Sequence, residues 1–269
     1  MYHVPNTQTL RHPSFKSTRQ LLEQKGQTAP SIIEWIADHN PEHPFFVYHD
    51  GTKLNEVSWR RVRDGIHRAA HYFSDRVKGP TSTTDRPVIA ILASTDSITY
   101  WTSVMGIARA NMAAFAISPR NAPDAIAHLL LNVQATALFV SSEAVLQNNA
   151  KRALELISTS EEYSSLTTIS IHPMTVFEDI YPTYPEADVK YFPVIEYDLD
   201  SPACIFHSSG TTAYPKPITW KYRDTVLWFR MPWFGEIDLA KKELDARDFP
   251  YHTLWEASHT VMQRPLALH

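Results

Sequence analysis

The sequence has 269 residues, of which 43% are hydrophobic and 20% charged, a balance typical of a globular protein with one large domain or two small ones. A formal net charge of −4 excludes a basic surface that would coat nucleic acid, so we expect no nucleic-acid partner. No apolar run approaches the roughly 20 residues that a membrane span needs, so we expect no membrane contact either.

The chain contains a single cysteine, Cys204, so no disulfide can form within it. A lone free thiol is typical of proteins from reducing compartments. Residues 1–15 lack the apolar core of a secretory signal peptide. These features predict a cytoplasmic protein.

The amino-terminal part of the sequence divides into a polar segment and a first helix. Residues 1–29 are polar without any periodicity, which predicts a loose tail. Ser31 and Glu34 have the spacing of a capping box, in which each side chain bonds the other residue's backbone N–H. We therefore expect regular structure to begin near residue 30.

A hairpin and an amphipathic helix are expected next. Residues 45–59 alternate in polarity around Asp50 and Gly51, a pair that favours a tight hairpin turn. Between Val62 and Val77, apolar residues recur every three or four positions, as on one face of a helix.

From residue 87 onward, short apolar runs alternate with helical patterns. The apolar runs predict buried strands at residues 87–93, 112–118, 135–141, 166–172 and 203–206. The segments between them predict helices at residues 94–110, 119–133 and 142–158. Strands separated by helices of this length favour an α/β fold with a mainly parallel sheet and flanking helices. The five prolines in residues 172–202 predict a long surface connection.

A polar loop follows the last predicted strand. It offers four hydroxyl side chains, one glycine that allows close backbone approach, and a lysine, at positions Ser208, Ser209, Gly210, Thr211, Thr212 and Lys216. Loops at the carboxyl ends of buried parallel strands bind ligands, and clustered N–H and O–H donors beside a cation suit a polyphosphate. The spacing fits neither a Walker A loop nor a dinucleotide fingerprint, and no G-x-S-x-G nucleophile elbow is present.

The stretch "SSGTTAYPKP" resembles the phosphate-binding signature of the adenylate-forming superfamily, which includes acyl-CoA synthetases, peptide-synthetase adenylation domains and luciferases. It departs from that signature at Ala213, where glycine is usual. The details "ISPRN", "AHLL", "IFHSSGTT", "PKPI" and "PWFGE" look most like fungal adenylate-forming reductases and aminoadipate-reductase-like proteins. The resemblance covers roughly residues 30–238.

The resemblance implies ATP-dependent activation of a carboxylic acid to an acyl-adenylate, with ATP and Mg²⁺ as cofactors. It also implies that cofactor-binding residues are His207, Ser208, Ser209, Gly210, Thr211, Thr212 and Lys216. No catalytic residue or metal ligand is identified.

The resemblance further implies a division of the chain into parts. Residues 30–240 would form an incomplete amino-terminal subdomain of an adenylate-forming enzyme, followed by a divergent tail at residues 241–269. The family's later acyl-pocket, Mg²⁺-binding and ribose-binding elements are not recognisable, so we expect a truncated product. A carrier protein or complementing domain outside this chain would be needed for turnover.

Two alternative functions remain. The chain could be a non-catalytic remnant of an adenylation domain that binds nucleotide weakly or binds a protein. A cysteine hydrolase would need Cys204 and His207 to pair, but residues three apart at a strand end point largely to opposite faces. A buried structural cysteine is the favoured interpretation of Cys204.

Overall fold

The computed structural model describes residues 14–77, 86–159, 169–183, 189–193, 195–208 and 214–234. The chain divides into two compact units, Met1–Phe229 and Arg230–His269. In the second unit, only the last residues of one helix are described. None of the described helices is long and apolar enough to cross a membrane.

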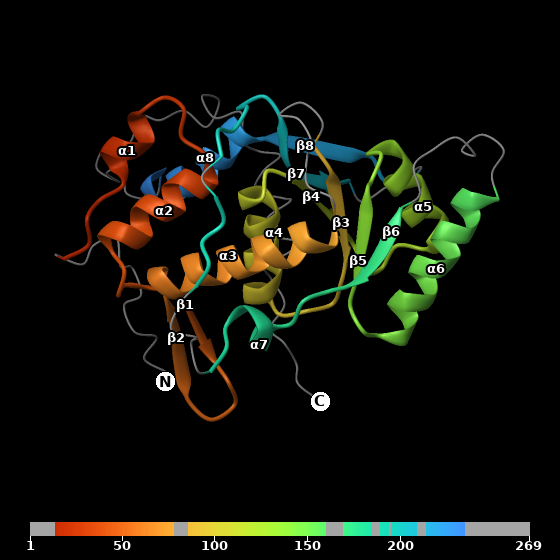
Figure 1. Ribbon diagram of the computed structural model, residues 1–269, viewed down its shortest axis with the longest axis horizontal. Coiled ribbons are helices and arrows are strands. Elements are labelled where there is room, and N and C mark those ends of the chain that lie inside the picture. The colour runs from red at the N-terminus through yellow and green to blue at the C-terminus, as the bar shows by residue number, and fades with distance from the viewer. Residues whose placement is uncertain are drawn as a thin grey trace, which may run out of the picture. The chain divides into compact units, whose positions relative to one another are not determined.

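A two-stranded antiparallel hairpin stands apart from the main sheet. It consists of β1 (Pro44–His49) and β2 (Leu54–Ser58), which confirms the predicted hairpin (Figure 1). Asp50 Oδ1 accepts hydrogen bonds from the backbone N–H groups of Thr52 and Lys53, at 2.8 and 2.9 Å. Gly51 has a φ of 95°, a conformation that favours glycine.

The main sheet has six strands in the order β6-β5-β3-β4-β7-β8. All neighbouring pairs are parallel except β7 with β8, which confirms the mainly parallel sheet. The strands are β3 (Val88–Leu92), β4 (Ala113–Ile117), β5 (Ala137–Val140), β6 (Ser170–Pro173), β7 (Pro202–His207) and β8 (Pro217–Lys221).

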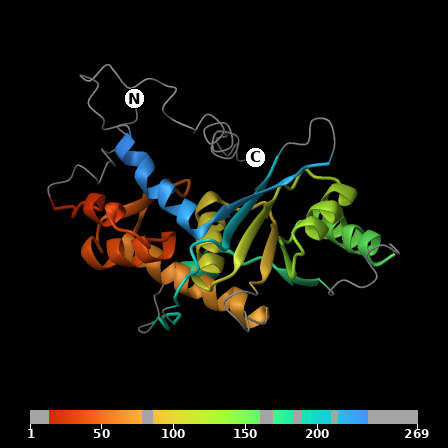
Figure 2. The same ribbon diagram turned by 90° about the horizontal axis from the view of Figure 1, so that it is seen from above.

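Helices cover both faces of this sheet (Figures 1 and 2). One face carries α3 (Trp59–Arg76) and α4 (Ser97–Arg109), which pack against each other, with α2 (Ala29–His39) against α3. The other face carries α5 (Pro123–Asn132) and α6 (Ala144–Ser158). Helices on both faces explain why the central strands are apolar throughout.

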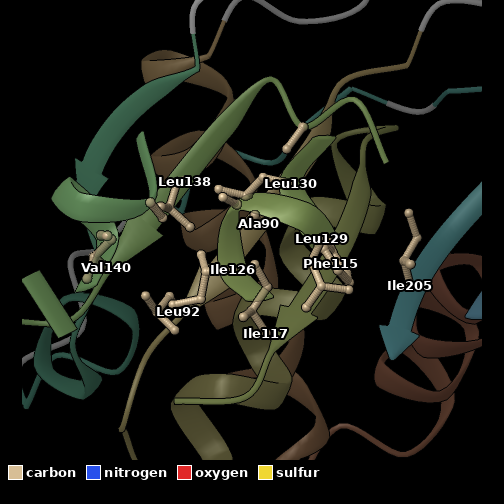
Figure 3. Packing of buried hydrophobic residues seen from close by; sticks show 14 of the residues in the cluster. Ala90, Leu92, Phe115, Ile117, Ile126, Leu129, Leu130, Leu138, Val140 and Ile205 are labelled. Carbon is tan, nitrogen blue, oxygen red and sulfur yellow. The ribbon is translucent and has the colours of Figure 1, made fainter. Parts of the chain in front are cut away.

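The core under α5 and α6 is built from alternate strand residues. Leu92, Phe115 and Leu138 are fully buried and meet Ile126 and Leu130 of α5 (Figure 3). On the opposite face of β5, Phe139 packs edge-on against Phe73 of α3, with ring centroids 4.7 Å apart. The alternation follows from the two-residue period of a strand.

Two predictions about the amino-terminal part are wrong. The described portion of residues 1–29, predicted to be loose, contains α1 (Arg19–Glu23) and the buried side chains of Phe15 and Leu22. The capping box of α2 is formed by Thr28 and Ser31, not by Ser31 and Glu34. Thr28 takes the N-cap position because Pro30 fits the first turn, where no N–H is needed.

The segment after β6 is not a simple surface connection. It contains α7 (Phe177–Ile180), and the neighbouring Tyr181 is buried, with its hydroxyl 2.7 Å from Thr102 Oγ1 of α4. A strand that the sequence did not predict, β8, follows the polar loop and leads into α8 (Tyr222–Phe234). Thus the polar loop joins two antiparallel strands at one end of the sheet.

Candidate functional site

The polar loop begins and ends at a hydrogen-bonded neck. Beyond the last strand pair, the Ser208 N–H donates to the Lys216 carbonyl at 3.0 Å, and the Lys216 N–H donates to Ser208 Oγ at 3.0 Å. The structure therefore brings these two predicted site residues together, and the Lys216 side chain is exposed to solvent. The predicted residues Ser209, Gly210, Thr211 and Thr212 lie outside the described residues.

His207, the last residue of β7, contacts the turn that follows β4. Its Nε2 accepts a hydrogen bond from the Ser118 N–H at 3.0 Å and lies 3.3 Å from Asn121 Nδ2. Its Nδ1 lies 2.9 Å from the Ser208 carbonyl oxygen. The contact arises because β4 and β7 are parallel neighbours, so their carboxyl ends meet at one edge of the sheet.

The far side of the loop is attached to α5. The Tyr214 hydroxyl donates to Asp124 Oδ2 at 3.2 Å, and its ring stacks on His128 with centroids 4.8 Å apart. The hydrogen bond to Asp124, together with the negative charge of that carboxylate, raises the pKa of Tyr214. Both described ends of the loop therefore contact the segment that runs from β4 into α5.

Cys204 does not form a nucleophile with His207. The thiol is 1% exposed, and burial raises its pKa to about 12, so it stays protonated near neutral pH. Both ring nitrogens of His207 face Ser118, Asn121 and Ser208 instead. This arrangement offers no activated thiolate.

The described loop residues fit a phosphate group better than a metal ion. Ser208 offers a hydroxyl and Lys216 an exposed cation, and both suit the oxygens of a polyphosphate. No cluster of three or more His, Cys, Asp or Glu side chains that could hold a metal ion occurs within the described ranges. Neither Ser208 nor Lys216 carries a carboxylate, so neither would itself hold Mg²⁺.

Five residues around the loop were not identified from the sequence as site residues, namely Ser118, Asn121, Asp124, His128 and Tyr214. The stretch "ISPRN" containing Ser118 and Asn121 was noted only as a family likeness. These residues could have been assigned to the loop only from the strand order, in which β4 lies beside β7. The predicted strand runs carry no such information, because 84 residues separate the end of β4 from the start of β7, from Ser118 to Ser201.

Comparison with known proteins finds relatives over most of this chain. Residues 33–248 match the family model described as AMP-binding enzyme. The chain is 34% identical over 248 residues to adenylate-forming reductase Nps10 of Heterobasidion annosum, covering 86% of this chain and 22% of that protein. It is 28% identical to adenylate-forming reductase Nps11 of Serpula lacrymans, covering 80% and 20%. The chain thus spans about a fifth of the length of these curated relatives.

Solved structures show the same fold. The N-terminal domain of FACL13 from Mycobacterium tuberculosis has a TM-score of 0.52 at 16% identity, over 73% of this chain and 44% of that one. The o-succinylbenzoate CoA synthetase of Bacillus subtilis, in complex with its acyl-adenylate intermediate, has a TM-score of 0.54 at 15% identity, over 80% and 47%. With the family model matched over most of its length, this chain belongs to the AMP-binding family of adenylate-forming enzymes.

Proposed function

We propose that this chain supplies the phosphate-binding part of an enzyme that activates a carboxylic acid with ATP. The observation that carries the proposal is the neck between Ser208 and Lys216, which places a hydroxyl and an exposed cation at the carboxyl end of parallel strand β7. Family membership supports the use of ATP at such a loop. The acid, a carrier protein and a cytoplasmic location are parts of the same proposal.

In the proposed reaction, a carboxylate oxygen forms a bond to the α-phosphorus of ATP, and the bond from that phosphorus to the bridging oxygen breaks. Pyrophosphate leaves with the bonding electron pair, and an acyl-adenylate remains. Lys216 would stabilise the negative charge that builds up on the leaving pyrophosphate. Ser208 and the loop residues Ser209, Gly210, Thr211 and Thr212 would hold the phosphates in place with O–H and N–H donors.

ATP–pyrophosphate exchange with a panel of carboxylic acids tests this proposal. It is combined with the rise in Tm of the purified chain on addition of Mg·ATP. We expect Lys216→Ala to lose every signal that the unmodified chain gives, whether that is exchange together with the Tm rise or the Tm rise alone. Lys221→Ala is the matched control, because Lys221 is an exposed lysine at the other end of β8 that pairs with Asp200.

Each outcome separates the alternatives. Exchange that depends on Lys216 supports carboxylate activation by this chain. A Lys216-dependent Tm rise without exchange supports phosphate binding by a non-catalytic adenylation module. Neither signal in the unmodified chain, or equal loss in Lys221→Ala, would contradict a phosphate site at this loop.

A further inference from the structure

His207 has a defined proton arrangement. The Ser118 N–H can only donate, so Nε2 must accept, and the Ser208 carbonyl can only accept, so Nδ1 must donate. The imidazole therefore carries its proton on Nδ1. The rings of Phe115 and His207 are nearly perpendicular, with centroids 6.4 Å apart and planes at 83°.

The two ring nitrogens of His207 connect two segments far apart in sequence. Nε2 contacts the β4–α5 turn at Ser118 and Asn121, whereas Nδ1 contacts Ser208, the first residue of the polar loop. Ser208 in turn holds Lys216 through its hydroxyl oxygen. A continuous series of hydrogen bonds thus runs from the β4–α5 turn to the backbone of the loop's lysine.

We propose that His207 is a positioning residue, which fixes the loop entrance to the β4–α5 turn, and not a direct ligand of the phosphates. The inference rests on the proposed function of this loop as a phosphate site. It changes the role of His207 among the predicted cofactor-binding residues, because both of its nitrogens are used by protein atoms. Because this attachment fixes the loop entrance before the phosphates bind, less conformational entropy is lost on binding. The affinity of the loop for the phosphates is therefore higher.

The attachment of Tyr214 to α5 strengthens the same conclusion from the other end of the loop. Tyr214 contacts Asp124 and His128, which follow Asn121 by three and seven residues. Both described ends of the loop are therefore held by one continuous segment, residues 118–128. His207 holds the neck that Ser208 and Lys216 form, where the loop begins and ends.

Three substitutions separate the functions of the two nitrogens. His207→Gln places an amide oxygen near the position of Nε2, so the Ser118 N–H keeps an acceptor. His207→Asn places an amide near Nδ1, so the Ser208 carbonyl keeps a donor but Ser118 loses its partner. His207→Phe keeps a ring of similar size and removes both hydrogen bonds.

The first measurement is amide hydrogen exchange in the chain without nucleotide. We expect the amides of Ser118 and Lys216 to exchange at least about tenfold faster in His207→Asn and His207→Phe than in the unmodified chain. His207→Gln should restore slow exchange at Ser118. The second measurement is the Kd for Mg·ATP, which we expect to weaken at least about tenfold in the Asn and Phe variants and to recover to within about threefold in the Gln variant.

If His207 acted through packing alone, His207→Phe would keep the amide exchange rates and the Kd for Mg·ATP of the unmodified chain. That result would overturn the inference. Equal amide exchange at Ser118 in His207→Gln and His207→Asn would also overturn the inference. If His207→Phe fails to fold, the comparison of these two variants is the test. If the unmodified chain binds no Mg·ATP, the proposed function fails. The exchange rates then still show whether His207 joins the two segments.

Discussion

Gly106 of α4 lies directly against Ala69 of α3, so that a Cβ on Gly106 would stand 2.5 Å from the Cβ of Ala69. It would also lie 2.9 Å from the backbone nitrogen of Ala70. Backbone atoms cannot rotate away as a flexible side chain can. The two helices that cover one face of the sheet therefore approach as closely as they do because residue 106 has no side chain.

Gly106→Ala should lower the free energy of unfolding by about 1–3 kcal/mol, because the added methyl group forces α3 and α4 apart. The gain in helix propensity, about 1 kcal/mol, does not offset this overlap. Urea unfolding followed by circular dichroism measures the change. Asn148→Ala, at an exposed position of α6, is the control and should be neutral or slightly stabilising. A Gly106→Ala midpoint at or above that of the unmodified chain would contradict the close contact.

A second prediction concerns Glu34 of α2, which lies 2.8 Å from Nε2 of His67 and accepts a hydrogen bond from Nε of Arg109 at 3.2 Å. Burial acts to raise the pKa of Glu34, but the close contact with His67 and the charge and hydrogen bond of Arg109 outweigh it. The pKa is held below the ordinary value of 4.5. Because the folded state lowers this pKa, Glu34 stabilises the fold above pH 4.5, and the stabilisation is lost as the pH falls below it.

Glu34→Gln should therefore destabilise the chain at pH 7 by about 1–3 kcal/mol, since a hydrogen-bonded charge is lost. The difference from the unmodified chain should shrink as the pH is lowered through 4.5. Urea midpoints at pH 7 and at several acidic values measure it. Glu56→Gln, an exposed carboxylate on β2, is the control and should change stability by less than about 0.5 kcal/mol. A gap between Glu34→Gln and the unmodified chain that widens in acid would refute the assignment.

The elements that the sequence predicted well share a strong local signal. The hairpin at Asp50 and Gly51, and the buried strands β3, β4 and β5, follow from turn chemistry and from apolar runs. β8 was missed because it is short, begins with Pro217 and exposes Ile218 and Thr219. An edge strand of this kind has no buried period to recognise.

The residues of the loop could be predicted from the sequence, whereas the residues that hold the loop could not. Ser208 and Lys216 are recognisable because their motif is contiguous in sequence. Asn121 and Ser118 reach His207 only because the chain passes from β6 across the sheet to place β7 beside β4. Strand order of that kind depends on tertiary packing, which no local pattern encodes.

A third prediction concerns the Tyr222 hydroxyl, which is fully buried and donates to the Ala108 carbonyl of α4 at 2.7 Å. Tyr222→Phe leaves that carbonyl without this donor and should cost about 1–3 kcal/mol of stability. Tyr214→Phe is a matched control for stability, because Tyr214 is 49% exposed. Removal of its hydroxyl group should cost less than about 0.5 kcal/mol of stability. Urea unfolding of both variants gives the comparison. Equal midpoints for the two would show that the buried hydroxyl contributes nothing.

The last prediction concerns Cys204, the only cysteine of the chain. With its pKa raised to about 12 by burial, the thiolate fraction at pH 8 is on the order of a thousandfold below that of a free cysteine. We expect the folded chain to react with Ellman's reagent at least that much more slowly than the chain in concentrated urea, where one thiol should react promptly. The reaction in urea is the control for reagent and thiol content. Fast reaction of the folded chain would contradict the buried, protonated state of Cys204 and would restore the cysteine hydrolase as a candidate.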